Sequence, residues 1–275
     1  MSPRILTIII LLVLVSLFYG YGRFVEPYRL TITRLDLQIK GYFQTSGSLR
    51  TVLLSDLHIE EFGRREEKVL EAVSGLEPDI IFITGDFIQT RSDPDGAAKF
   101  VSCLTAPLGI WGIIGNIDKT APDLKELITR LEDAGLTMLI NKRHRIAKDG
   151  LEFDLVGLSL KAGEETIKTV FQGREGGIPE IVLMHWPRLI DKVIPYQPQL
   201  ILCGHTHGGQ VRLPLIGKAI ARFISGTHYD MGLFQISNTW LYVNRGVGMT
   251  NHPIRLFCPP EVSAINLEVI QLPFN

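Results

Sequence analysis

Polar side chains of metal-ligand type follow five short apolar runs of this 275-residue chain. In chain order they stand in "DLH", "GD", "GNID", "HWP" and "GHTH". All are oxygen or imidazole donors, the types that hold Zn, Mn or Fe, and four of the seven histidines are among them. The eight residues are Asp56, His58, Asp86, Asn116, Asp118, His185, His205 and His207.

Each of these motifs alone is weak evidence for a metal site. A "GD" or "GN" pair usually forms a turn, and an isolated histidine is usually a core or surface residue. Their repeated position directly after an apolar run favours a shared site, because ligands gather at the carboxyl ends of strands in α/β sheets. The number of donors exceeds what one ion needs. It therefore predicts two divalent metal ions that share a carboxylate.

The spacing within two of the motifs predicts how they bind. Asp56 and His58 are expected to hold one ion, because side chains at i and i+2 of an extended segment project to the same side. In "GHTHGG", Gly204 is expected to allow a sharp turn. Gly208 and Gly209 would let the backbone approach the metal ions or a phosphate group closely.

The segments before these motifs are unbroken apolar runs, which predict buried strands covered on both faces. Helical patterns at 64–76 and 121–134 alternate with them, and this alternation predicts an α/β layered domain. A hairpin is expected over 137–160, an early strand or two within 30–39, and further strands in the tail, 228–270. The five runs span 51–55, 80–84, 109–114, 181–184 and 200–203.

The first 23 residues predict a membrane anchor. No charged residue lies from Ile5 to Tyr19, and the apolar run covers about 18 residues or roughly 27 Å of helix, just enough for a bilayer's hydrocarbon core. A cleaved signal peptide is the alternative, but "SLFYGYG" is a poor cleavage site. Tyr19, Tyr21 and Arg23 favour an uncleaved single-pass anchor, because aromatic residues and a basic stop mark a membrane interface.

The rest of the chain is expected to form one catalytic domain over 50–275, joined to the anchor by a connecting segment and first strand, 24–49. Positive charge flanking the anchor is greater on its C-terminal side, which favours a cytoplasmic domain under the positive-inside rule. Arg4 stands before the apolar run, whereas three arginines follow it: Arg23, Arg29 and Arg34.

Composition excludes some partners. Lys and Arg number 28 against 29 Asp and Glu, for a net charge of -1, so there is no general basic signal for nucleic acid. No segment indicates an obligate protein partner. The cysteines are odd in number, and their spacing is not that of a metal site. Both observations predict buried free thiols rather than a disulfide framework. They are Cys103, Cys203 and Cys258.

The order D-x-H, G-D, G-N-x-D, H, G-H-x-H resembles the calcineurin-like metallophosphoesterase superfamily over nearly all of the chain after the anchor. "CGHTHGGQVRLP" and "RGVGMTNHPIRLFCPPEVSAINL" are similar to its bacterial membrane-associated branch, which implies an inner-membrane location. That branch holds UDP-2,3-diacylglucosamine pyrophosphohydrolases of lipid A biosynthesis and phosphodiesterases that act on phospholipids. The resemblance implies a four-layer α/β/β/α sandwich, preceded here by one transmembrane helix.

By the same resemblance, two divalent ions (Mn, Zn or Fe) are the cofactors and promote in-line attack of water on phosphorus. The candidate catalytic residues are Asp86, Asn116 and Asp118, of which Asp86 would bridge the ions. The resemblance assigns Asp56, His58 and His207 to one ion, and Asn116, His185 and His205 to the other.

One position departs from the family pattern. Most members have G-N-H-D/E, whose histidine protonates the leaving group, but this chain has Ile117 there. General acid catalysis contributes typically about 10²–10⁴-fold, so its loss matters for an alcohol leaving group. A phosphate leaving group departs as an anion without protonation, and the change therefore favours a pyrophosphate bond. Other candidates for the acid are Lys119, His228 and His252.

Arginines of the C-terminal half are candidates for binding phosphate. Arg245 is the first choice for substrate binding, because it lies between an apolar run and glycines in "NRGVG". The others are Arg188, Arg212 and Arg255.

Three functions follow from these observations. The leading hypothesis is a membrane-anchored metallophosphoesterase that cleaves a lipid-linked pyrophosphate, such as UDP-2,3-diacylglucosamine. The first alternative is a broad-specificity phosphodiesterase acting on phospholipids. The second is a non-catalytic, metal-holding domain that binds a partner, which "GNID" would explain.

Overall fold

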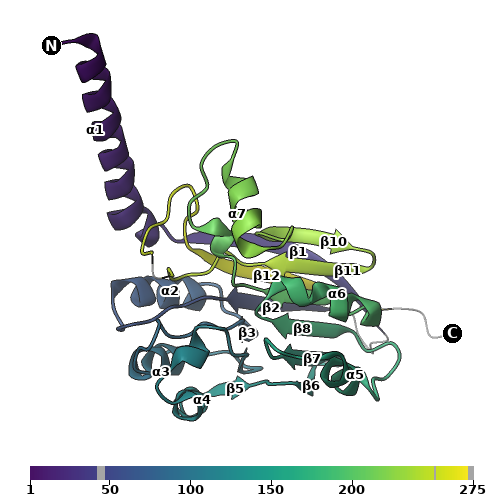
Figure 1. Cartoon of the computed structure of the whole chain (residues 1–275). Helices are drawn as coiled ribbons and strands as arrows, with labels where there is room; N and C mark the ends of the chain where they lie inside the picture. Colours follow the sequence, from purple (N-terminus) through teal and green to yellow (C-terminus); the bar gives the residue numbers. More distant parts are fainter. Residues whose placement is uncertain (42–46, 251, 272–275) are drawn as a thin grey trace.

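The computed structural model describes residues 1–41, 47–250 and 252–271 and contains two six-stranded sheets packed face to face (Figure 1). Each sheet is mainly parallel. The first has the order β1 (Thr31–Gly41), β12 (Glu261–Gln271), β2 (Gly47–Leu54), β3 (Ile80–Ile83), β4 (Ile110–Gly112), β5 (Leu136–Met138). The second has the order β10 (Gly232–Ile236), β11 (Thr239–Val243), β9 (Leu200–Cys203), β8 (Glu180–Met184), β7 (Leu151–Leu158), β6 (Lys142–Lys148).

Alternate residues of the central strands enter different cores, because successive side chains of a strand point to opposite faces. In β3, Ile80 and Phe82 pack between the sheets, whereas Ile81 and Ile83 pack against helices. β2, β8 and β9 follow the same rule. Both faces are therefore buried, as the unbroken apolar runs predict.

Helices cover the outer face of each sheet, which confirms the four-layer α/β/β/α sandwich. A separate helix, α7 (Gly217–Ser225), lies beside the turn that carries His207. The first sheet is covered by α2 (Arg64–Ser74), α3 (Asp95–Ser102) and α4 (Leu124–Asp133). The second is covered by α5 (Glu164–Phe171) and α6 (Ile190–Val193).

The hairpin expected over 137–160 is only partly correct. β6 and β7 do pair antiparallel, but Leu136–Met138 forms β5 at the edge of the other sheet. Asn141 has a positive φ of 51° where the chain leaves one sheet for the other. The apolar pattern of a single strand cannot show this crossing, since both parts are extended.

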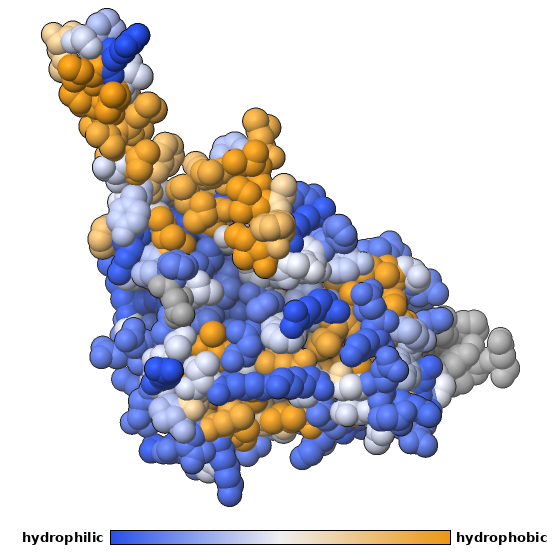
Figure 2. All heavy atoms as spheres, viewed as in Figure 1, coloured by the Kyte–Doolittle hydropathy of each residue, from blue (hydrophilic) through white to orange (hydrophobic). Residues whose placement is uncertain are grey.

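The first helix, α1 (Pro3–Phe24), projects from the rest of the molecule and is apolar over most of its surface (Figures 1 and 2). Within the described residues, Pro3–Tyr28 is the one helical stretch long and apolar enough to cross a membrane, and only 6% of its apolar window is buried. Its base is packed against the domain, because the Gly22 carbonyl accepts from the Arg255 N–H (2.9 Å).

The cysteines are all free, as expected, but one expectation about them is wrong. Cys203 and Cys258 are buried, whereas Cys103 is exposed at the end of α3. Cys103 is the residue directly after the last turn of this short helix.

Candidate metal centre

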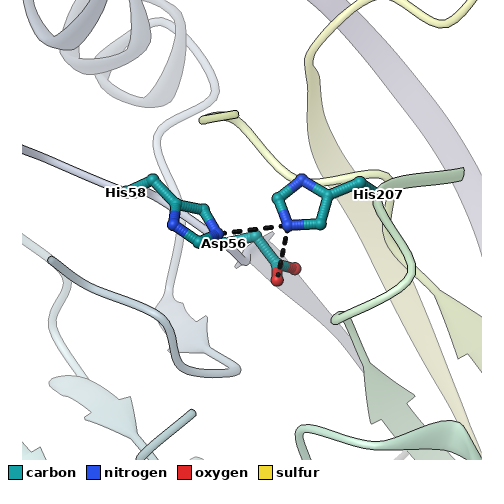
Figure 3. A group of neighbouring side chains, drawn as sticks. All are labelled: Asp56, His58 and His207. Atoms are coloured by element: carbon teal, nitrogen blue, oxygen red, sulfur yellow. Dashed lines mark hydrogen bonds and ion pairs between the residues drawn. The ribbon is translucent and has the colours of Figure 1, made fainter. Parts of the chain in front are cut away.

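Five of the predicted ligands form two groups of three buried side chains. Asp56, His58 and His207 make the first group (Figure 3), and Asp56, Asp86 and His185 make the second. Within each group, one ligand atom from each residue lies within 4.8 Å of the others. Asp56 belongs to both groups, so the two candidate metal positions are adjacent.

Short distances separate the side chains both within the first group and between the two groups. His207 Nε2 lies 3.1 Å from His58 Nε2 and 3.3 Å from Asp56 Oδ1. Asp86 Oδ2 lies 3.6 Å from His58 Nε2 and 3.4 Å from His185 Nε2. Asp86 therefore reaches a histidine of each group.

The remaining two predicted ligands flank His185. Asn116 Oδ1 lies 3.0 Å from His185 Nε2 and also accepts a hydrogen bond from Trp186 Nε1 (3.0 Å). The His205 ring lies 5.1 Å, centroid to centroid, from that of His185. The loops after strands of both sheets thus bring all seven residues to one place, whereas the simplest sequence argument assumes a single sheet.

The backbone of this centre differs from the expectation for "DLH". Asp56 and His58 are not extended but have left-handed φ values of 49° and 45°. Asp86, His205 and His207 also have positive φ (55°, 73° and 51°). Non-glycine residues adopt this conformation rarely and at some energetic cost, and they cluster at functional sites. The two residues do share a group, but a sharp turn rather than strand geometry brings them together.

Electrostatics leaves three histidines neutral. Burial lowers the pKa of His58 to about 4 and of His205 to about 3, and it also holds the pKa of His207 well below its usual value. A neutral imidazole has one nitrogen lone pair to offer. Since two facing Nε2–H groups would repel, at least one of the His58 and His207 Nε2 atoms presents its lone pair in this centre.

The buried carboxylates of Asp56 and Asp86 are stabilised by positive charge nearby. Burial opposes ionisation of Asp86, but His185 and His58 outweigh it and lower the pKa of Asp86 to about 2. Burial, together with Asp86, raises the pKa of Asp56 to about 6. His185 responds to both: burial opposes its protonation, yet the carboxylates raise its pKa to about 9. Buried negative charge of this kind is paired or coordinates a metal ion, so the donor set fits divalent cations.

Hydrogen bonds from other residues hold the ligands in place. His185 Nδ1–H donates to the Thr84 carbonyl (2.6 Å), which directs Nε2 toward Asp86 and Asn116. Asp56 Oδ2 accepts from Ser55 Oγ (2.5 Å) and from the His205 N–H (2.9 Å).

Asp118 supports the centre and lies outside both ligand groups. Its carboxylate accepts four backbone N–H groups: those of Gly115, Asp86, Phe87 and Ile88, at 2.8, 2.9, 2.7 and 3.3 Å. Burial and the nearby Asp86 raise the pKa of Asp118 to about 7, although the N–H donors oppose this shift. Asp118 thereby fixes the loops that carry Asp86 and Asn116 to each other.

Glycines allow the loop of the second sheet that carries His205 and His207 to approach its neighbours closely. Gly204 has no positive φ; instead, a Cβ there would lie 1.7 Å from Ser55 Oγ. Gly209 does need its left-handed φ of 85°, and a Cβ there would lie 2.6 Å from Ala221 Cβ in α7. Only glycine fits at either position.

The candidate phosphate-binding arginines are in different environments. Arg245 pairs with Glu261 (3.2 Å) and Arg212 with Asp230 (2.6 Å). Arg255 is fully buried and donates to backbone carbonyls, including that of Gly248. Arg188 is exposed, and its Cζ lies 3.7 Å from the ring centroid of Trp186, the residue that donates to Asn116.

A cavity of about 580 Å³ runs from the base of α1 to His58. Its lining includes Arg23 and Tyr28 from the α1 end, together with Arg64 and Met249. A larger cavity, about 730 Å³, lies at the amino ends of β9 and β11 and contains none of the seven residues. Of the seven candidate ligands, His58 alone lines the smaller cavity.

Sequence reasoning missed the supporting residues. Trp186 directly follows His185 in "HWP", and this position next to a candidate ligand could have indicated a supporting role. Ser55 and Thr84 carry no such signal, because each is a small residue at the end of an apolar run. The candidate acids His228 and His252 are exposed, as is Lys119, and none belongs to either ligand group.

Comparison with known proteins gives consistent results. The profile of the calcineurin-like phosphoesterase family matches residues 49–209. The metallophosphoesterase YkuE of Bacillus subtilis is 29% identical over 257 residues, covering 91% of this chain and 90% of its own. The phosphodiesterase YaeI of Escherichia coli is 30% identical over 258 residues, covering 90% and 92%. The UDP-2,3-diacylglucosamine pyrophosphatase LpxG of Chlamydia muridarum is 27% identical over 298 residues, covering 88% and 90%.

Among solved structures, TT1561 of Thermus thermophilus is similar in fold, with a TM-score of 0.51 at 12% identity over 73% of this chain and 91% of its own. The relatives named phosphodiesterase and pyrophosphatase argue against a non-catalytic, partner-binding domain. The chain belongs to the calcineurin-like phosphoesterase family, and it is a phosphoester hydrolase whose cluster of Asp and His side chains implies a pair of divalent metal ions.

Proposed function

We propose that this chain is a membrane-anchored hydrolase of a lipid-linked pyrophosphate or phosphodiester, with UDP-2,3-diacylglucosamine as the test substrate. Asp86 is proposed to bridge two ions, of which Mn²⁺ is the first to test. Its Oδ2 lies 3.6 Å from His58 and 3.4 Å from His185, one histidine of each group. The proposed ligands are Asp56, His58 and His207 for one ion, and Asn116, His185 and His205 for the other.

When bound, such a pair of ions supplies a water nucleophile at neutral pH and stabilises the charge of the phosphoryl group. The chain's own residues position this chemistry. Thr84 and Ser55 orient His185 and Asp56 through the hydrogen bonds described above. Asp118 holds the Asp86 loop in position, because four backbone N–H groups donate to the Asp118 carboxylate.

The proposal of a pyrophosphate bond as the bond cleaved depends on Ile117. Its N–H donates to Asp86 Oδ1 (2.7 Å), so this residue adjoins the candidate bridging carboxylate. An isoleucine side chain cannot protonate a leaving group there. Cleavage of a pyrophosphate bond, which is a phosphoanhydride, suffers less from this loss than cleavage of an alkyl ester, because phosphate leaves as an anion.

The lipid part of the proposal is supported by a cavity at the base of α1. The cavity of about 580 Å³ is lined both by Arg23 at the base of the anchor and by His58, and we propose that a lipid headgroup lies there while its acyl chains remain in a bilayer. LpxG, a similar protein over 88% of this chain, is named for a diacylated sugar nucleotide.

Arg188 is proposed to bind the substrate's phosphate, ahead of Arg245. Arg245 is already paired with Glu261, whereas Arg188 is exposed beside Trp186, close to Asn116. We expect Arg188→Ala to raise KM with little effect on kcat, and Arg245→Ala to act mainly on stability. Steady-state kinetics and thermal unfolding of the two variants separate these effects.

The proposed location is the cytoplasmic face of a bacterial inner membrane, with a single α1 span. Arg23 and Arg29 lie at the domain end of α1, and Arg29 donates to the hydroxyl of Tyr21 (2.6 Å). Cysteine accessibility to a membrane-impermeant reagent in intact cells and in inverted vesicles tests this side, with the exposed Cys103 as the reporter.

The decisive experiment is a substrate panel on the full chain in lipid nanodiscs with Mn²⁺. The substrates are UDP-2,3-diacylglucosamine, a bis-aryl phosphodiester and an alkyl phosphomonoester, and mass spectrometry identifies the products. We expect kcat/KM to be highest on the pyrophosphate and Asp86→Ala to abolish turnover. A preference for the alkyl monoester over both other substrates would overturn the proposal.

A phosphodiesterase acting on phospholipids is the second candidate, and similarity to YaeI over 90% of the chain favours it. Product analysis on mixed phospholipids distinguishes the two functions. Release of a phosphorylated headgroup or phosphatidic acid, without cleavage of the nucleotide lipid, would assign this second activity.

A further inference from the structure

One segment beyond α1 exposes apolar side chains as a continuous group, and we call it the apolar loop (residues 213–224, including most of α7). Figure 2 shows it as a second apolar protrusion beside α1. Beyond residue 40, the described part of the chain exposes eight large apolar side chains, and six of them lie here. They are Leu213 (41% exposed), Leu215 (102%), Ile216 (52%), Ile220 (41%), Phe223 (89%) and Ile224 (73%).

The charges of the apolar loop suit a lipid surface. No acidic residue occurs from Val211 to Tyr229, and Lys218 is the one exposed cation within the loop. Arg222 is turned back to Asp230, which it meets at 3.0 Å, together with Arg212 at 2.6 Å. These pairs tie the ends of the loop to the domain and leave its outer face apolar. Helices that lie in a membrane interface have such an apolar face together with basic residues.

The apolar loop is continuous with the base of α1. Arg255 N–H donates to the Gly22 carbonyl (2.9 Å), and the Phe18 ring lies 6.1 Å from that of Phe257. On its other side, the same stretch pairs with the start of the loop, where Arg212 N–H donates to the Leu256 carbonyl (2.8 Å). Residues 254–257 therefore join α1 to the apolar loop, and Figure 1 shows α1 and α7 on the same side of the sheets.

The apolar loop is also attached to the metal centre. Gly209, two residues after His207, packs against Ala221 of α7 so closely that a Cβ there would lie 2.6 Å from the Ala221 Cβ. The Arg212 side chain donates to the Gly208 carbonyl (2.9 Å). Whatever fixes the position of the loop thus also fixes the position of the His207 turn.

We propose that the apolar loop inserts into the phospholipid bilayer that holds α1, as a second membrane contact next to the metal centre. Leu215 and Phe223, the most exposed of its side chains, enter the acyl region, and Lys218 meets the lipid phosphates. The proposal depends on membrane anchoring by α1 and not on the reaction catalysed. Two contacts fix the tilt of the domain, so that the cavity between α1 and His58 opens at the lipid surface.

Quenching of a fluorescent label by brominated phospholipids tests this contact. The full chain in nanodiscs carries one NBD label at a time: on Phe223→Cys, on Leu215→Cys or on Leu12→Cys in α1, each in a Cys103→Ser background. The wild type, labelled at its exposed Cys103, is the matched control, since the other two cysteines are buried. We expect the loop labels to lose about half or more of their fluorescence, as the α1 label does, and the Cys103 label to lose almost none.

The outcomes separate the loop from the anchor. Quenching at Leu12→Cys but at neither loop position would overturn the proposal and leave anchoring intact. No quenching at any position would show that α1 is not in the bilayer and would remove the anchored function as well. Loop labels with blue-shifted emission but no quenching would place a second copy of the chain on the loop, which also overturns the proposal.

Discussion

The two sheets supply different candidate ligands to one centre and hold them by different means. Loops after β2, β3 and β4 provide the carboxylates and the amide, whereas loops after β8 and β9 provide three of the four histidines. On the first side, a single buried carboxylate, that of Asp118, fixes the loops through four N–H groups. On the second side, close packing of Gly209 against α7 fixes the turn that carries His207, whereas His185 is held by the Thr84 carbonyl.

This difference has a consequence for function. The first side depends on the hydrogen bonds of Asp118, which is fully buried in the domain. The second side rests on a helix whose other face is exposed and apolar. We therefore expect a change at the protein surface to reach the metal centre through the second side, by way of the turn that carries His207. The first side should keep its position.

Loss of the proposed bridging carboxylate should have the largest effect. In Asp86→Asn, the contacts at 3.6 and 3.4 Å to the histidines of both groups lose their negative charge. We expect kcat/KM to fall by about 10³-fold or more, equal to about 4 kcal/mol of transition-state stabilisation. The matched variant is His205→Ala, because His205 lies outside both three-residue groups. Metal content by mass spectrometry and kinetics should show a smaller loss there; equal losses would contradict the bridging role.

Asp118→Asn tests the support of the first side. The new amide presents N–H groups to backbone N–H donors, and buried donors left without acceptors cost about 1–3 kcal/mol each. We expect the unfolding midpoint to fall by about 4–8 °C and activity to fall about 100-fold, through displacement of the Asp86 loop. Asp123→Asn is the control, since Asp123 caps α4 at the surface and asparagine caps equally well. Unchanged stability in Asp118→Asn would refute this role.

Gly209→Ala tests the support of the second side. The added Cβ would meet Ala221 at 2.6 Å, on a backbone with φ of 85°. Gly226→Ala is the matched control, because Gly226 also has a positive φ (64°) but has open space around it. Both variants should lose about 1–2 kcal/mol from the left-handed backbone. Only Gly209→Ala should also lose activity, by about 10-fold, through movement of the His207 turn. Equal activity in the two variants would show that packing on α7 does not position the centre.

The sequence predicts much of the fold and the meeting of the candidate ligands at one place. Apolar runs predicted the central strands, because both of their faces are buried, and all seven predicted ligands follow such runs and lie together. The assignment of each ligand to an ion stays a prediction. The tail strands β10, β11 and β12 also lie within the predicted strand-rich region, 228–270, apart from the last residue of β12.

Three features were beyond reach for physical reasons. Strand patterns do not tell which sheet a strand joins, so the crossing between β5 and β6 was missed. The left-handed backbone of Asp56 and His58 arises from tertiary contacts, whereas the i, i+2 spacing alone predicts an extended segment. The apolar loop has too few residues for a membrane span, and only its exposure in the folded chain distinguishes it from a core helix.

The smallest expected effect belongs to Ile117→His, which restores the family's acid beside the carboxylate side of the centre. The returned histidine would lack an orienting partner, because Asp118, the next residue, already accepts four backbone N–H groups. We therefore expect a gain of only about 10-fold on an alkyl phosphodiester, at the low end of or below the usual contribution of about 10²–10⁴. No gain is expected on a pyrophosphate, whose leaving group needs no proton. Ile117→Asn, polar but unable to transfer a proton at neutral pH, controls for polarity. A gain of equal size on both substrates, or in both variants, would mean that position 117 does not select the bond to be cleaved.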